Sequence, residues 1–200
     1  MNVTSEAELR EVVPAPPARA WEKESDHLNE DAAAFIAVSP FAVLATADSD
    51  GRCDASPRGG PPGFATLLDP RRLAIPDYTG NRRQDSHRNI LANPFVGLVF
   101  FVPGVLETLR VNGRATLSTD PELLASLATG GQPPKLALDI AIETSFVHCG
   151  KAPIRSALWD PSTWPEGVNL ACARARGTGE TADEVQQRWN AAYRDPDQVW

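Results

Sequence analysis

The sequence has little cysteine. Its 200 residues include three cysteines, Cys53, Cys149 and Cys172, and no two of them form a CxxC pair. An odd number without paired spacing argues against a disulfide framework and against a structural zinc site. We therefore expect the protein in a reducing cytoplasm.

Long apolar runs and excess positive charge are also missing. The longest nearly apolar stretch, 32–47, is interrupted by Ser39, Pro40 and Thr46, so it is too broken to span a membrane. The start of the chain is polar and acidic, and we expect no signal peptide. The net charge of −7 disfavours nucleic acid or an anionic membrane as a partner.

The common catalytic motifs are absent. The sequence contains no GxSxG, HExxH, GxGxxG or Walker motif, and its three histidines lack the spacing of metal ligands. His148 beside Cys149 is a weak nucleophile pair, because neighbouring strand residues point to opposite faces. The catalytic residues stay unknown, with Asp77, Tyr78 and His148 as the only candidates for an acid or base.

Hydrophobic residues make up 42% of the chain, which is enough for a substantial core. The length favours one domain with extensions. Residues 1–20 are rich in Pro, Ala and Glu and predict a flexible N-terminal arm. Residues 21–164 are expected to form the domain, and residues 165–200 a C-terminal helical extension with a Thr181–Glu184 capping box.

The middle of the chain predicts mainly β structure. Apolar runs bounded by turn residues predict about seven strands, at 41–46, 52–58, 64–68, 72–76, 95–102, 107–118 and 136–149. Short helices are expected at 27–38, at 84–92 and after Asp120. Asp50-Gly51 predicts a hairpin, and Gly113 a bulge. Without a regular βαβ alternation, an antiparallel barrel is favoured over a doubly wound sheet.

Arginine is concentrated in one part of this acidic chain. Seven arginines lie between residues 58 and 110, at positions 58, 71, 72, 82, 83, 88 and 110. Two turn-rich stretches, 51–63 and 75–88, carry four of these and follow apolar runs. Guanidinium groups beside turn backbone and a helix start bind phosphate well, so these stretches predict a pocket for a phosphate-bearing cofactor. The alternative is that the arginines are simply solvated.

A further cluster follows the last strand. If residues 151–159 are helical, Lys151, Arg155 and Trp159 lie on one face and could line an aromatic anionic ligand. The alternative is a docked tryptophan beside two cations whose stems lie along the surface.

Five segments resemble a known family. They are SPFAVLAT (39–46), ASPRGGPPGF (55–64), IPDYTGNRRQDSHRNILANPFVGLVFF (75–101), ETLRVNGRA (107–115) and HCGKAPIRSALWDP (148–161). In order and spacing they resemble the pyridoxamine 5′-phosphate oxidase-like flavoproteins, over about three-fifths of the chain. The resemblance implies an FMN-binding split β-barrel of Greek-key type with N- and C-terminal helical extensions.

The resemblance also implies a homodimer with FMN at the subunit interface. It places the phosphate on Arg58, Arg83 and Arg82. The backbone near the isoalloxazine ring and the polar contacts would come from Ser56, Pro57, Ile75, Pro76, Asn81, Ser86 and Thr108. Lys151, Arg155 and Trp159 would reach the flavin from the partner subunit, where a cation near N1 would raise the potential.

The function expected from this resemblance is an FMN-dependent oxidoreductase acting on a small molecule, with NADPH or NADH as the candidate electron donor. The C-terminal Arg- and His-bearing substrate motif of true pyridoxamine 5′-phosphate oxidases is not visible, so vitamin B6 oxidation is not expected. Two alternatives stay open. One is a non-catalytic FMN carrier or sensor, and the other is a relative that uses deazaflavin or haem on the same barrel. Haem is least favoured because no axial ligand pattern is present.

Overall fold

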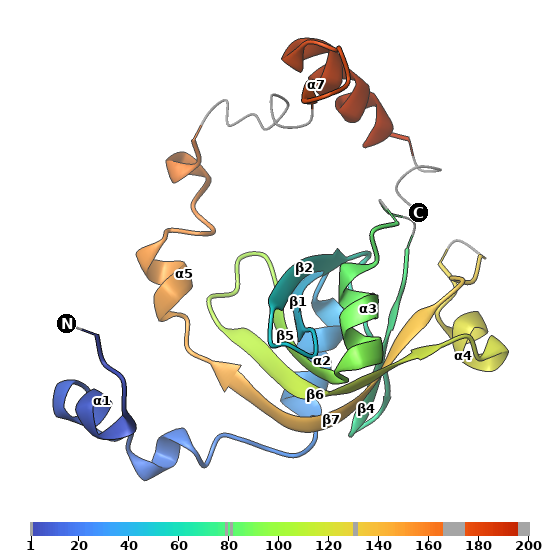
Figure 1. The fold of residues 1–200 in the computed structure, drawn as a ribbon. Helices are drawn as coiled ribbons and strands as arrows, with labels where there is room; N and C mark the ends of the chain where they lie inside the picture. Colours follow the sequence, from blue (N-terminus) through green and yellow to red (C-terminus); the bar gives the residue numbers. More distant parts are fainter. Residues whose placement is uncertain (1, 79, 81, 130–131, 166–174, 196–200) are drawn as a thin grey trace.

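A computed structural model describes residues 2–78, 80, 82–129, 132–165 and 175–195 (Figure 1). Its strands are β1 (Phe41–Ala47), β2 (Cys53–Gly59), β3 (Thr66–Asp69), β4 (Arg72–Pro76), β5 (Phe95–Phe101), β6 (Thr108–Ser118) and β7 (Ala137–His148). Its helices are α1 (Glu6–Val12), α2 (Glu30–Val38), α3 (Asp85–Ala92), α4 (Pro121–Ser126), α5 (Lys151–Arg155) and α7 (Ala182–Ala192), with short 3₁₀ turns at Ala18–Ala20 and Pro161–Thr163.

The strands form one seven-stranded sheet in the order β2-β1-β5-β6-β7-β4-β3, and every neighbouring pair is antiparallel. The sheet curls around a core (Figure 1). Two neighbour pairs, β1 with β5 and β4 with β7, join strands that are not consecutive in the chain. The mainly β, split-barrel architecture expected from the sequence is confirmed, and the predicted strand positions agree to within two residues.

Strand alternation decides which side chains fill the barrel. In β1, Ala42, Leu44 and Thr46 are buried while Phe41 and Ala45 are exposed. This period of two places one face of each strand in the interior. The largest fully buried side chains belong mostly to strands: Leu44, Leu73, Ile75, Leu98, Phe100, Leu109, Val111, Leu138 and Ile140, joined by Ile36 of α2.

The predicted hairpin and the predicted bulge are both present in the structure. The β1–β2 hairpin closes through Asp48, whose Oδ1 accepts hydrogen bonds from the backbone N–H groups of Asp50 and Arg52. The pairing of β6 with β7 shifts between Asn112 and Gly113, which is the expected bulge. A Cβ at Gly113 would collide with the carbonyl oxygen of Ala141, so the close approach of the two strands requires glycine.

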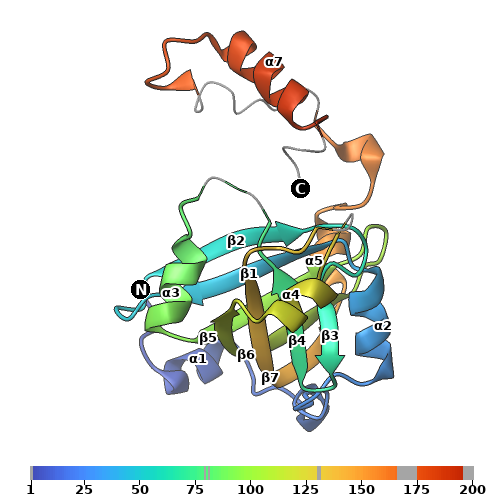
Figure 2. The same ribbon diagram turned by 90° about the vertical axis from the view of Figure 1, so that its right-hand side faces the viewer.

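Helix α3 lies against β1, β2 and β6 (Figure 2). Two hydrogen bonds between side chains attach it there. Ser86 Oγ donates to Asp54 Oδ2 of β2 at 2.9 Å, and Asn89 Nδ2 donates to Thr46 Oγ1 of β1 at 3.0 Å. These contacts place the first turn of α3 directly over one face of β2.

The segments outside the barrel are partly helical. Within the predicted N-terminal arm, α1 contributes no buried residue. Helix α7 begins with the predicted capping box between Thr181 and Glu184, and it lies apart from the barrel in both views (Figures 1 and 2). The division into arm, barrel and extension remains a prediction. Within the described ranges, no helix combines the length and the apolarity that a membrane crossing needs.

Candidate functional site

One face of β2 carries polar side chains toward α3. Asp54, Ser56 and Arg58 are half-buried, whereas the residues between them, Ala55 and Pro57, are exposed. Because successive strand residues alternate between faces, the three polar side chains share the side on which α3 lies.

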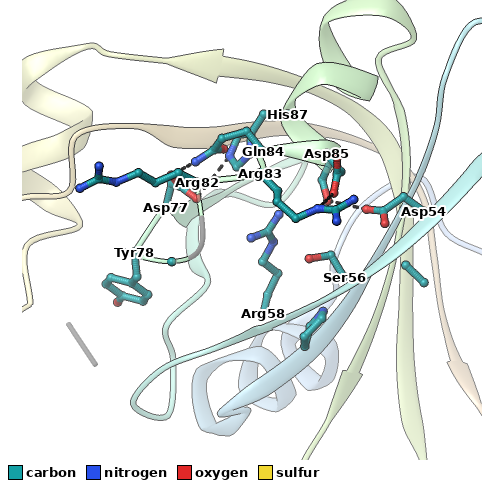
Figure 3. Close-up of a pocket in the computed structure, with 14 residues that line it drawn as sticks. Asp54, Ser56, Arg58, Asp77, Tyr78, Arg82, Arg83, Gln84, Asp85 and His87 are labelled. Carbon is teal, nitrogen blue, oxygen red and sulfur yellow. Dashed lines mark hydrogen bonds and ion pairs between the residues drawn. The ribbon is translucent and has the colours of Figure 1, made fainter. Parts of the chain in front are cut away.

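A cavity of about 180 Å³ lies between this face of β2, the loop that follows β4, and the start of α3 (Figure 3). Its lining includes six residues expected from the sequence to bind a cofactor: Ser56, Pro57, Arg58, Arg82, Arg83 and Ser86. The fold therefore brings Arg58 and Arg83, which are 25 positions apart in the sequence, to one cavity.

Arg58 is the half-buried cation of this cavity. Its Nε atom is buried and receives no hydrogen-bond partner among the described residues. Burial lowers the pKa of Arg58, and the charges of Asp77 and Asp54 act in the opposite direction. Because guanidinium starts from a very high pKa, Arg58 keeps its positive charge at neutral pH. A buried, charged donor without a partner is costly unless a ligand satisfies it.

Arg83 is in a different environment. Its side chain is 73% exposed, and its Nε lies 2.8 Å from Asp85 Oδ2. The hydrogen bond to Asp85 raises the pKa of Arg83, and the negative charge of the same carboxylate adds to this effect. Arg83 therefore lies at the mouth of the cavity with a protein partner already in place.

The backbone that enters α3 also suits an anion. Arg82 and Gln84 both have positive φ angles, 60° and 57°, which are uncommon for residues other than glycine. Among the described residues, no side chain caps the helix at Gln84. The N–H groups of the first turn lack a side-chain cap at the positive end of the helix dipole, where an anion is favoured.

Three carboxylates share the cavity with the three arginines. Asp54 accepts the hydrogen bond from Ser86, Asp77 Oδ2 accepts one from Gln84 Nε2 at 3.3 Å, and Asp85 pairs with Arg83. The cavity thus combines three carboxylates with the arginines from which the sequence analysis predicted a phosphate pocket. The sequence analysis missed Asp54, although strand alternation from Ser56 and Arg58 would have placed it on the same face.

The second residue that sequence reasoning missed is His87. It lines the cavity, is 5% exposed, and neither ring nitrogen makes a hydrogen bond with a described residue. Burial lowers the pKa of His87, Arg58 lowers it further, and the charge of Asp77 opposes both effects. The ring is therefore neutral at neutral pH. Helical spacing in the sequence could have indicated that His87 is buried, because His87 and Ile90 lie on the same, buried face of α3.

Other expected site residues lie outside this cavity. Ile75 and Pro76 are buried in β4, and Thr108 is buried at the start of β6, where it pairs with His148. Asn81 falls outside the described residues. The closest of these to the cavity in the chain is Pro76, which directly precedes the lining residue Asp77.

The expected common helical face of Lys151, Arg155 and Trp159 is wrong. Helix α5 ends at Arg155, and Ala157 has a φ of 48°, so the chain turns before the tryptophan. Trp159 instead donates its Nε1–H to the carbonyl of Val105 at 2.8 Å, while Lys151 and Arg155 are exposed. The observed arrangement is closer to the alternative interpretation of the sequence, in which the tryptophan packs against the protein beside two surface cations.

The polar groups that line the cavity suit a phosphate group. It has room for a phosphate group, and it offers Arg58 Nε, the start of α3 and the hydroxyl of Ser56 as donors. The described residues contain no group of three His, Cys, Asp or Glu side chains placed to hold a metal ion. The hydrogen-bond donors Arg58 Nε and Ser56 Oγ suit an oxyanion.

Solved structures with similar folds come from several bacteria. HupZ of Group A Streptococcus is 19% identical, with 60% of this chain and 93% of that chain covered and a TM-score of 0.49. A putative pyridoxamine 5′-phosphate oxidase of Lactobacillus delbrueckii is 24% identical, with coverage of 61% and 95% and a TM-score of 0.47. An F420 reductase is 20% identical, with coverage of 60% and 98% and a TM-score of 0.44. No match was found among curated proteins.

The model of the pyridoxamine 5′-phosphate oxidase family matches residues 28–149. The match covers more than half of the chain and contains all seven strands and α3. The protein belongs to the pyridoxamine 5′-phosphate oxidase family, as the resemblance of its sequence segments indicated.

Proposed function

We propose that the protein binds FMN and holds the cofactor phosphate in the cavity between β2 and α3. One observation carries this proposal: Arg58 presents a buried Nε that has no hydrogen-bond partner among the described residues, beside a helix start without a side-chain cap from them. A phosphate would satisfy the guanidinium and the backbone N–H groups together. Membership of the family supports a flavin as the molecule that carries this phosphate.

The outer face of the sheet supports a homodimer. Paired residues place Pro57, Val43, Val99, Arg110 and Phe146 in one row across five strands, on the face opposite the core. Arg110 lies 5.0 Å from the centroid of the Phe146 ring. Four of the five residues in this row are apolar, which suits an interface, and we propose that a second copy of the chain packs against the row.

Pro57 connects the two features, because it lines the phosphate cavity and also belongs to the outer row. A cofactor held by its phosphate in the cavity would therefore extend toward the proposed dimer interface. In this arrangement Pro57 would contact the cofactor near the proposed interface, the location that the family resemblance implies.

Bound FMN would supply hydride transfer, and we propose that the protein is an FMN-dependent oxidoreductase acting on a small molecule. The chain's own contribution is to hold the phosphate through Arg58 and to set the charge around it through Asp54 and Asp77. NADPH and NADH are the electron donors to test first, and a reducing cytoplasm is the proposed compartment.

The test is to reconstitute the purified protein with FMN and record its absorption spectrum and its reduction by NADPH or NADH without oxygen. The proposal expects stoichiometric FMN that the donor reduces. Bound FMN that neither donor reduces would favour a carrier or sensor. Protein that takes up a deazaflavin or haem but not FMN would overturn the cofactor assignment.

A further inference from the structure

His87 is a buried polar residue for which the proposed site has not yet given a role. We propose that His87 and Arg58 together recognise the cofactor phosphate, so that the site binds FMN in preference to riboflavin. This inference rests on the proposed function, because it names a second recognition residue in the same cavity.

The geometry of His87 supports a ligand contact. The residue lies in the first turn of α3 and lines the cavity together with Arg58 (Figure 3). Nδ1 and Nε2 are both buried without a hydrogen bond from the described residues. A neutral imidazole always carries one N–H donor and one acceptor nitrogen, so an oxyanion in the cavity would satisfy the donor.

The charged groups around the ring do not already satisfy it. Asp77 Oδ1 lies 3.4 Å from His87 Nε2, which is an ion-pair distance but lacks hydrogen-bond geometry. The other carboxylate oxygen of Asp77 accepts from Gln84. Arg58, on β2, repels a proton on the imidazole. A phosphate entering between Arg58 and His87 would pair with both and offset that repulsion.

A purely structural role does not account for these features. The neighbouring buried residue on the same helix face, Ile90, packs into the core without any polar atom. An apolar side chain at position 87 would also fill this space and would bury no polar atom. The imidazole instead buries two nitrogen atoms that lack a hydrogen bond, which costs free energy of folding. A ligand that supplies an acceptor explains why a histidine is useful at this position.

The experiment measures dissociation constants for FMN and riboflavin by quenching of flavin fluorescence. The proteins are the wild type, His87→Leu, His87→Gln and, as the matched control, His27→Leu, because His27 is an exposed histidine outside the cavity. The expected result is a rise of about tenfold in the FMN dissociation constant for His87→Leu, with riboflavin binding unchanged. His87→Gln keeps an N–H donor and should recover most of the FMN affinity.

A second measurement keeps the proposal testable if His87→Leu does not fold. Ring nitrogen signals of His87 in the wild-type protein should shift when FMN is added and stay in place with riboflavin. Equal FMN affinity in His87→Leu and wild type, or a shift with both flavins, would overturn the role of His87. Failure of the wild type to bind FMN at all would instead overturn the proposed function, so the two failures are distinguishable.

Discussion

At the scale of single residues, burial separates two arginines that look equivalent in the sequence. Arg58 is held on a strand face with an unsatisfied Nε, whereas Arg83 is exposed and paired with Asp85. Two charged groups that are shielded from water attract each other more strongly than two at the surface, where water screens the attraction. At the surface, Asp85 also competes with phosphate for Arg83. The strength of phosphate binding should therefore depend mainly on Arg58.

The first prediction compares these arginines. Arg58→Met should raise the FMN dissociation constant by about thirtyfold, corresponding to about 2 kcal/mol for a lost charged hydrogen bond. Arg83→Met should raise it only a few-fold, because Arg83 must leave Asp85 to bind phosphate. Arg88→Met, at an exposed position outside the cavity, is the control. If Arg83→Met raised the FMN dissociation constant more than Arg58→Met, the main phosphate contact would lie at the mouth of the cavity instead.

The second prediction concerns pH. Burial lowers the pKa of His87 in the free protein, and a bound phosphate would raise that pKa by adding a negative partner. His87 then binds a proton more readily in the complex than in the free protein. FMN affinity should therefore increase as pH falls from above the pKa of His87 in the complex to below its pKa in the free protein.

The phosphate of FMN titrates near pH 6 itself, which weakens binding at low pH in every variant. The informative quantity is therefore the difference between wild type and His87→Gln across this range. Titrations at several pH values should show that wild type gains affinity relative to His87→Gln as pH falls. Parallel curves would mean that His87 does not change its protonation on binding.

Sequence reasoning reached only part of the site at this scale. Arg58, Arg82 and Arg83 were predicted because arginines beside turns and a helix start have a known chemistry, and Ser86 was predicted from the family resemblance; all four line the cavity. His87 was not found, because its burial depends on how α3 lies against β1 and β2, which are distant in the sequence.

At the scale of elements, local signals placed most strands and helices. Pro40 ends α2, Asp50-Gly51 forms the hairpin, and Asp120 with Pro121 begins α4. The α5 segment differs because spacing alone suggested a helix through Trp159. The observed helix ends at Arg155, and the indole hydrogen bond to Val105 fixes Trp159 in a separate turn.

The third prediction tests the β6–β7 bulge. Gly113→Ala should lower the free energy of unfolding by about 2 kcal/mol or more, because its Cβ would meet the backbone of Ala141 and force the strands apart. Urea denaturation measures the change. Gly80→Ala is the matched control, since an added Cβ at Gly80 meets no atom within 4 Å. Equal stability of the two variants would show that the bulge accommodates a side chain.

At the scale of the whole molecule, the strand order depends on contacts that no local pattern encodes. The pairing of β1 with β5 and of β4 with β7 brings together strands separated by other strands. The resemblance of five segments to a known family predicted a split β-barrel, but it did not predict these two pairings. The same topology brings β2 and α3 together, and so it builds the cavity.

The fourth prediction tests the proposed dimer. Val99 lies in the centre of the apolar row, between Val43 and Arg110. Val99→Asp should convert the dimer to a monomer in sedimentation velocity and weaken FMN binding, because a buried charge is costly at an interface. Leu91→Asp is the control, as Leu91 is 77% exposed on α3 outside the row. A monomeric wild type, or an unchanged dimer in Val99→Asp, would contradict this interface.

A crystal structure of the protein with FMN tests the phosphate site most directly. The phosphate should lie within hydrogen-bond distance of Arg58 Nε and of the first backbone N–H groups of α3, with His87 beside it. A phosphate found elsewhere, with Arg58 still unpaired in the cavity, would contradict the account.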